Sequence, residues 1–123
     1  MVTPAALALM ALLGAVPERP VVPRCVPGTL ADLEALVRQT GRTRVVFFAT
    51  WCAPCRAHVR TADAKTVLVG AFDDPERLNR ALGPVDPRIP CLADRGIAAA
   101  LGIKGVPAIV ERKAHGWERQ DRE

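Results

Sequence analysis

The sequence predicts one α/β domain with a layered sheet, and three observations carry this prediction. Continuous apolar runs rich in β-branched and aromatic residues, typical of buried strands, alternate with segments of helical length. The chain has 123 residues, 50% of them hydrophobic, which is enough for one core and too few for a second catalytic domain. A C-x-x-C motif directly follows one of the apolar runs, so two thiols should lie at the end of a buried strand.

Two segments precede the predicted domain. Residues 1–16 contain an apolar run, residues 5–16, which is too short to span a bilayer and has the length of a signal-peptide core. We therefore expect export to the periplasm or another extracytoplasmic compartment, with membrane association through this run as the alternative. Residues 17–28 carry four prolines, which fix φ and remove hydrogen-bond donors, and are predicted to be an extended spacer. The folded domain should occupy residues 29–123.

The first element of this domain is predicted to be a helix over residues 29–41. Thr29 is a suitable N-cap, Asp32 follows three residues later, and Gly41 is a suitable stop. One apolar stripe runs along the segment, formed by Leu30, Leu33, Leu36 and Val37.

Strands and helices alternate along the remainder of the chain. Buried strands are predicted at residues 44–50 and 65–72, with a helix at residues 52–63 between them. Beyond these, the pattern predicts a capped helix over residues 73–83, a short strand over residues 88–94 and a short helix over residues 95–102. A further strand over residues 107–113 is predicted to turn into a hairpin at its end.

The charge pattern argues against a nucleic-acid partner. Seventeen Lys and Arg against thirteen Asp and Glu give a formal charge of +4, but the two signs are interleaved along the chain. Aromatic residues are few and tyrosine is absent, so no base-stacking surface is expected.

The C-x-x-C motif places two thiols where a strand passes into a helix. Cys52 should lie at the helix N-terminus, where the partial positive charge and the free amides favour the thiolate. Cys55 follows one turn later, close enough to attack a mixed disulfide formed at Cys52. Pro54 suits an early helical position, and Arg56 adds positive charge nearby. The motif therefore predicts a nucleophile and a resolving thiol.

Other chemistries of the same motif stay open at this point. Cys52 and Cys55 could bind zinc together with His58 and a distant cysteine, Cys25 or Cys91. They could also be two inert buried thiols. Covalently attached haem is excluded, because C-x-x-C-H would need a histidine at the position of Arg56.

Two segments together resemble the thioredoxin superfamily. FFATWCAPC, residues 47–55, is similar to the active-site segment, and LGIKGVPAIV, residues 101–110, is similar to the segment that carries the cis-proline of that family. The extra helix and strand between them resemble the insert of the exported TlpA/ResA and cytochrome c biogenesis thioredoxins. The resemblance covers residues 29–117. It implies a thioredoxin fold with three α/β/α layers and a mixed sheet.

The resemblance also implies a role for each motif residue. Cys52 would be the attacking thiol and Cys55 the resolving thiol. The predicted position of Cys52 at the surface, at the helix N-terminus, also indicates that it is the more exposed and the more readily ionised of the two. The surface that binds the substrate would be formed by Trp51, Ala53, Pro54, Val106 and Pro107, with a cis bond between the last two.

The chain departs from the family pattern in two places. Val46 stands where thioredoxins often have a buried acid, so proton transfer must use water or another group. The final helix of the fold is missing, because residues 117–123 carry no apolar stripe, and one sheet face should therefore need another cover.

The remaining candidate residues have simpler interpretations. Cys25 and Cys91 could form a structural disulfide in an exported protein, or be two unrelated thiols. His58 and His115 are interpreted as solvated polar residues, and Trp117 as a core residue or a cover for the sheet.

The function expected from these observations is thiol–disulfide exchange. An exported oxidoreductase would act on cysteine-containing client proteins, with reduction favoured over oxidation, and would need a redox recycling partner but no cofactor or metal. The alternative is a non-enzymatic thioredoxin-like module that binds a metal or a partner protein through the same surface.

Overall fold

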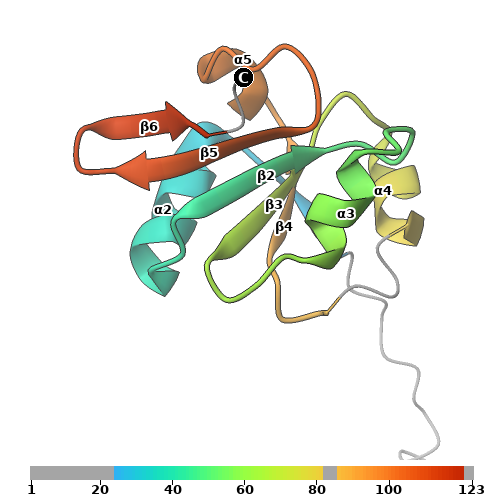
Figure 1. The fold of residues 1–123 in the computed structure, drawn as a ribbon, viewed down its shortest axis with the longest axis horizontal. Helices are drawn as coiled ribbons and strands as arrows, with labels where there is room; N and C mark the ends of the chain where they lie inside the picture. The colour runs from blue at the N-terminus through green and yellow to red at the C-terminus, as the bar shows by residue number, and fades with distance from the viewer. Residues whose placement is uncertain (1–23, 82–85, 121–123) are drawn as a thin grey trace, which may run out of the picture.

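A mixed six-stranded sheet with helices on both faces forms the protein (Figure 1). The structure is a computed structural model, and it describes residues 24–81 and 86–120. The predicted signal peptide, most of the predicted spacer, and the last residues of the helix predicted at 73–83 lie outside the described residues.

Ten elements make up the described part of the chain. The strands are β1 (Cys25–Gly28), β2 (Arg44–Phe48), β3 (Thr66–Gly70), β4 (Cys91–Asp94), β5 (Ala108–Lys113) and β6 (Gly116–Arg119). The helices are α2 (Leu30–Thr40), α3 (Cys55–Arg60), α4 (Pro75–Ala81) and α5 (Ile97–Ala100). Every strand and helix predicted from residue 29 onward has a counterpart here. The predicted α/β class is therefore confirmed.

The order of the strands brings the loops after β2 and β3 and the loop before β5 to one edge of the sheet. The order is β1-β4-β3-β2-β5-β6, in which the first four strands are parallel and β5 and β6 are antiparallel to their neighbours. Phe48, at the end of β2, pairs with Gly70, at the end of β3, and Phe47 pairs with Ala108, at the start of β5. The segments that follow β2 and β3 therefore meet the segment that precedes β5.

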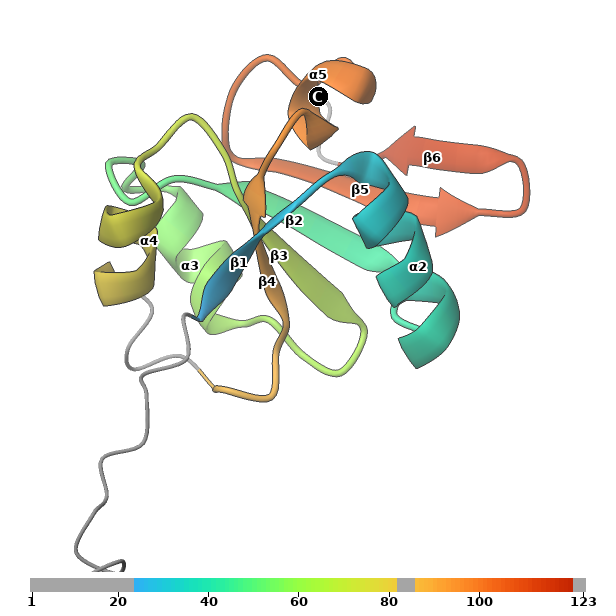
Figure 2. The ribbon, with the colours of Figure 1, turned by 180° about the vertical axis from the view of Figure 1, so that it is seen from behind.

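Each face of the sheet carries its own apolar cluster. Val46 and Phe48 of β2 point to the face covered by α3 and α4, whereas Val45 and Phe47 point to the face covered by α2 and α5. Figures 1 and 2, drawn from opposite sides, show α3 in front of the sheet in one view and α2 in front of it in the other. The strands are thus covered on both faces, as their continuous apolar runs predict.

Helix α2 begins and ends at the residues that the sequence indicates. The Thr29 side chain accepts a hydrogen bond from the backbone N–H of Asp32, and the Asp32 carboxylate accepts one from the N–H of Thr29. This bond from the Thr29 amide, and then the bond from the Thr29 hydroxyl, lower the pKa of Asp32. Gly41 ends the helix with a left-handed φ of 77°.

Strand β1 corrects the predicted start of the domain. Residues 25–28, which the sequence placed in the spacer, pair in parallel with β4, so the domain begins before Thr29. Four residues with a proline among them give no strand periodicity, and the pairing partner lies more than 60 residues away. As an edge strand, β1 is protected by the Asn79 side chain, which accepts a hydrogen bond from the N–H of Cys25.

The hairpin of β5 and β6 is held against α2 by its tryptophan. Trp117 Nε1 donates to Glu34 Oε2 at 3.1 Å, and the Arg112 guanidinium lies 5.2 Å from the centre of the Trp117 ring. On the opposite face, Glu111 pairs with Arg44, and Ile109 packs against the cluster below α3. Within the described residues, β5 and β6 thus present no large exposed apolar side chain, and Ile109 is partly buried.

None of the described helices has the length and apolar character needed to cross a membrane.

Candidate active site

Cys52 and Cys55 form a disulfide at the junction of β2 and α3. Their Cα atoms are 5.3 Å apart. The helix predicted over residues 52–63 is shorter, Cys55–Arg60, so Cys52 precedes it by three residues and does not lie in its first turn. Pro54 stands at the N-cap, and the residues before it form tight turns, in which Cys55 N donates to Cys52 O and Arg56 N donates to Ala53 O, both at 3.1 Å.

The amide of Cys55 nevertheless points at the Cys52 sulfur. Cys55 N lies 3.2 Å from Cys52 Sγ, in a buried position. A backbone N–H directed at a sulfur atom stabilises negative charge on that atom. This amide belongs to the first residue of α3 and is shared with the carbonyl oxygen of Cys52, which lies 3.1 Å from it.

Both cysteines are buried in apolar surroundings. Cys52 is 4% exposed and Cys55 1%, so the expected difference in exposure between the two residues is small. The cluster around them includes Val46, which is 3% exposed, and Phe48.

The substrate-binding residues named from the sequence lie around the disulfide. Trp51, Ala53 and Pro54 are exposed on the loop that contains Cys52. Val106 packs against the cluster that contains both cysteines, and Pro107 follows it directly before β5. The bond between Val106 and Pro107 is cis, as the resemblance implies. The structure therefore brings the two motifs together at one edge of the sheet.

Asp73 is a residue of this site that sequence reasoning missed. Its Oδ2 accepts hydrogen bonds from Thr50 N and Thr50 Oγ1, both at 2.6 Å. Its Oδ1 accepts one from Asp74 N at 2.8 Å and faces Arg77 Nη1 at 3.4 Å. The Asp73 side chain has no exposed surface. The segment that leads to Cys52 is thus anchored to the segment that follows β3.

The charge of Asp73 is stabilised by these contacts. Burial is the largest single influence on its pKa and raises it, but the bonds from Thr50 and Asp74 and the charge of Arg77 together outweigh burial. The pKa of Asp73 therefore lies below its usual value. In the sequence, Asp73 indicated only the start of a helix, and no local pattern signals that its side chain turns back to Thr50.

Phe72 is the second residue that the sequence did not reveal. It was predicted as the last residue of a strand, but β3 ends at Gly70 and Phe72 has a left-handed φ of 59°. Its carbonyl oxygen accepts a hydrogen bond from Trp51 Nε1 at 2.9 Å. Trp51 and Phe72, on two different loops, are therefore in direct contact.

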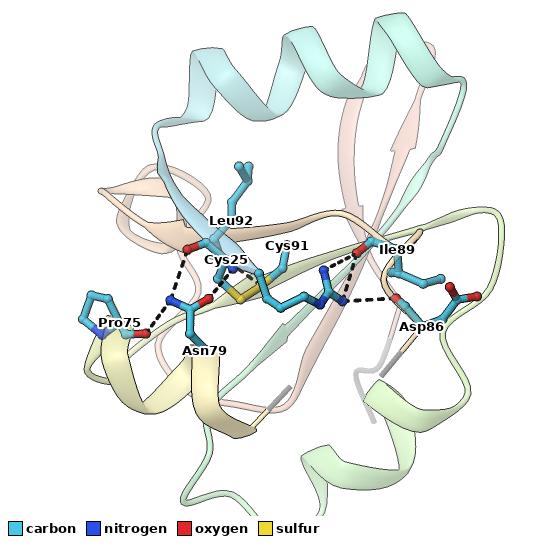
Figure 3. The surroundings of a disulfide bond; sticks show 8 residues. Cys25, Pro75, Asn79, Asp86, Ile89, Cys91 and Leu92 are labelled. Atoms are coloured by element: carbon cyan, nitrogen blue, oxygen red, sulfur yellow. Dashed lines mark hydrogen bonds between the residues drawn. A yellow bond between two sulfur atoms is a disulfide. The ribbon is translucent and has the colours of Figure 1, made fainter. Parts of the chain in front are cut away.

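Cys25 and Cys91 form a second disulfide in different surroundings (Figure 3). The two residues face each other in register on β1 and β4, with Cα atoms 4.5 Å apart, and are 2% and 3% exposed. Asn79 of α4 accepts from Cys25 N at 2.6 Å and donates to Pro75 O at 2.9 Å. The Arg24 guanidinium donates to the carbonyl oxygens of Asp86 and Ile89. This bridge ties β1 to the inserted segment.

The described part of the chain offers no ligand group for the metal alternative. Within residues 24–81 and 86–120, no three His, Cys, Asp or Glu side chains form a group that could hold a metal ion. His58 is half-buried on α3, His115 is exposed in the turn between β5 and β6, and Trp117 packs on α2 away from the disulfide.

A scan against protein-family models and a search of the curated proteins found no match to this chain.

Proposed function

We propose that the protein is an extracytoplasmic thiol–disulfide oxidoreductase with a thioredoxin-like fold, of the kind that carries a helix–strand insert. The observation that carries the proposal is the Cys52–Cys55 disulfide at a strand–helix junction, with a backbone amide 3.2 Å from the Cys52 sulfur. The motif that contains Val106 and Pro107 lies at the same edge of the sheet, which supports a binding site for an extended client segment beside the sulfur.

The proposed reaction in the reductive direction has two exchange steps. The Cys52 thiolate attacks one sulfur of a client disulfide, forms a mixed disulfide and releases the first client thiolate. The Cys55 thiolate then attacks Cys52 Sγ, which forms the Cys52–Cys55 disulfide and releases the second client thiolate. The two protons of the cysteine pair end on the client thiols. A dithiol reductant, the recycling partner, restores the pair by the same steps in reverse.

We favour reduction over oxidation because the insert, which forms α4 and β4, resembles the insert of the TlpA/ResA group. The buried Cys25–Cys91 disulfide is compatible with an oxidising compartment, where structural disulfides persist. Clients would be proteins with accessible disulfides, and no cofactor takes part in either exchange step.

Turnover of insulin disulfides with dithiothreitol as electron donor tests the proposal. We expect catalysis by the wild-type chain, loss of catalysis in Cys52→Ser, and full activity in His58→Gln as the matched control on the same segment. A wild-type chain without thiol-dependent turnover would overturn the proposal in favour of a binding module. Loss of activity in His58→Gln, accompanied by zinc in the purified protein, would favour the metal-binding alternative.

A further inference from the structure

The turn that ends at Cys52 is bonded to the segment that follows β3. Cys52 N donates to Ala49 O at 3.2 Å, so Thr50 and Trp51 are the central residues of a tight turn. The first of these, Thr50, donates both its amide and its hydroxyl hydrogen to Asp73 Oδ2, each at 2.6 Å. The backbone that leads into the C-x-x-C motif is therefore held from outside by one carboxylate.

This carboxylate holds the turn through one oxygen and its own segment through the other. The Asp73 side chain has no exposed surface, so water does not compete for its oxygen atoms. Its second oxygen, Oδ1, accepts from Asp74 N at 2.8 Å and faces Arg77 Nη1 at 3.4 Å. Hydrogen bonds to an ionised carboxylate are among the strong ones in proteins. Oδ1 thus fixes Asp73 to the start of α4, and Oδ2 fixes Thr50 to Asp73.

The position of this turn becomes important once the Cys52–Cys55 disulfide is open. In the oxidised protein the S–S bond itself keeps Cys52 beside Cys55. Reduction removes this bond. Cys55 is still the first residue of α3, whereas Cys52 lies three residues before the helix. The backbone of Cys52 is then held by the turn from Ala49 and by the Cys55 amide, which lies 3.1 Å from Cys52 O. The place of the Cys52 sulfur therefore depends on a turn that Asp73 holds.

The two exchange steps differ in how much they depend on the place of this sulfur. In the first step, a client disulfide approaches the Cys52 thiolate from solution and adjusts its own position. In the second step, Cys55 Sγ must lie in line with Cys52 Sγ and the client sulfur, while both protein sulfurs are fixed by their own backbone. A misplaced turn should therefore slow the second step far more than the first.

We propose that Asp73 is a positioning residue for the second step: through Thr50 it keeps Cys52 Sγ in line for attack by the Cys55 thiolate. This inference rests on the proposed function. In that step a bond forms between Cys55 Sγ and Cys52 Sγ, and the bond from Cys52 Sγ to the client sulfur breaks. The client sulfur leaves with the electron pair as a thiolate, and the proton that Cys55 lost on ionisation reaches it through the solvent. Asp73 exchanges neither electrons nor protons.

A small aromatic disulfide, dithiodipyridine, separates the two steps. The full chain, with the Cys52–Cys55 pair reduced and the Cys25–Cys91 disulfide intact, is mixed with this reagent in a stopped-flow instrument. Attack by Cys52 releases one pyridinethione at a rate that rises with reagent concentration, and leaves a mixed disulfide. Attack by Cys55 on the mixed disulfide releases the second pyridinethione at a rate that is independent of concentration. One protein dithiol and one reagent molecule thus give one protein disulfide and two pyridinethiones.

Variants of the two bonded residues should slow the second release selectively. In Asp73→Ala, which loses both bonds to Thr50, we expect the second release to be about tenfold slower and the first to change by no more than about twofold, because misplaced reacting atoms cost at least this much. Thr50→Val loses only the hydroxyl bond and should slow the second release about threefold. Thr50→Ser keeps both bonds and should behave as wild type. Circular dichroism establishes that each variant is folded.

Asp63→Ala is the matched control, because Asp63 makes the same kind of contacts elsewhere. Its Oδ1 accepts from the Thr66 hydroxyl at 3.0 Å and from Lys65 N at 2.9 Å. These residues lie at the start of β3, whereas the turn that carries Cys52 lies at the opposite ends of β2 and β3. Both releases should keep their wild-type rates in Asp63→Ala.

Each contrary outcome has a distinct meaning. A wild-type rate of second release in folded Asp73→Ala would show that Asp73 serves stability alone, and the inference would be wrong. If both releases slow by the same factor, Asp73 acts on the reactivity of the Cys52 thiolate and not on its place. An equally slow second release in Asp63→Ala would also overturn the inference. If Asp73→Ala does not fold, Thr50→Val decides by the same comparison. If the wild type keeps a mixed disulfide and shows no second release, the proposed function fails first.

Discussion

The two disulfides of this protein belong to one buried cluster and yet connect the chain in opposite ways. Cys52 and Cys55 are three positions apart, whereas Cys25 and Cys91 are 66 positions apart. A disulfide stabilises mainly by restricting the unfolded chain, and the effect grows with the loop it closes. The chain-entropy relation gives about 4 kcal/mol for the long loop and about 1.5 kcal/mol for the short one. Opening the short loop therefore costs the fold little.

The two disulfides also differ in the elements that surround them. The Cys25–Cys91 bridge lies between two paired strands, with Asn79 bonded to the backbone of Cys25. The Cys52–Cys55 bridge lies where a loop enters a short helix, next to the exposed Trp51. Burial alone does not separate the two, since all four cysteines are nearly inaccessible. What separates the two bridges is their chain connectivity and the elements that hold them, paired strands for one and the entry to a short helix for the other.

The largest expected effect is on activity. Cys52→Ser and Cys55→Ser should each reduce insulin turnover to the uncatalysed rate, because each removes one of the two exchange steps. The double variant Cys25→Ala/Cys91→Ala should keep its turnover at a temperature where it is shown by circular dichroism to be folded. Loss of turnover in the folded double variant would mean that the second bridge takes part in the chemistry.

The next largest effect is on stability. Cys25→Ala/Cys91→Ala should lower the free energy of unfolding by about 4 kcal/mol, and Cys52→Ala/Cys55→Ala by about 1.5 kcal/mol. Urea denaturation of both variants and the wild type measures the two losses. Equal losses would contradict the division between a structural and a reactive bridge.

The sequence revealed local structure better than it revealed long-range partners. Thr29, Asp32 and Gly41 predicted both ends of α2, because caps depend on neighbouring residues. Strand β1 was missed because four residues gain strand character only from β4, which lies far along the chain. The thiol pair followed from the C-x-x-C spacing, but the anchor at Asp73 did not. An acidic residue two positions before a proline is typical of a helix start, and the bonds of Asp73 to Thr50 exist only after β2 and β3 have paired.

Asp73→Asn should destabilise the protein by about 2 kcal/mol, the usual value for hydrogen bonds to a charged group. The folded-state pKa of Asp73 lies below its unfolded value, so its contribution is complete above about pH 4 and is lost as the pH falls through the folded-state pKa. The difference in the free energy of unfolding between wild type and Asp73→Asn should therefore be constant near neutral pH and become smaller in acid. Urea denaturation of both proteins at several pH values measures this difference.

Arg77→Gln is the matched control for Asp73→Asn. Arg77 contacts the same carboxylate, but its side chain is 56% exposed, so its loss should cost no more than about 1 kcal/mol. If Arg77→Gln proves as costly as Asp73→Asn, the ion pair and not the bonds to Thr50 anchors the loop.

The smallest effect is expected for Phe72→Gly. Glycine relieves the left-handed strain, roughly 1–2 kcal/mol, while the contacts of a half-exposed ring are lost and the unfolded chain gains freedom. The opposing terms should leave the free energy of unfolding within about 1 kcal/mol of wild type. A loss of roughly 3 kcal/mol, typical of a buried aromatic residue, would show that Phe72 serves the core and not the surface.

The most direct test of the central claim is covalent trapping of clients in the native compartment. Both single variants, Cys52→Ser and Cys55→Ser, are isolated under non-reducing conditions after the free thiols have been blocked, and adducts are identified by mass spectrometry. Cys55→Ser should accumulate mixed disulfides through Cys52, because no thiol remains to resolve them, and Cys52→Ser should trap none. Adducts in Cys52→Ser with none in Cys55→Ser would contradict the assigned roles, and the absence of adducts in both variants would contradict thiol–disulfide exchange as the function.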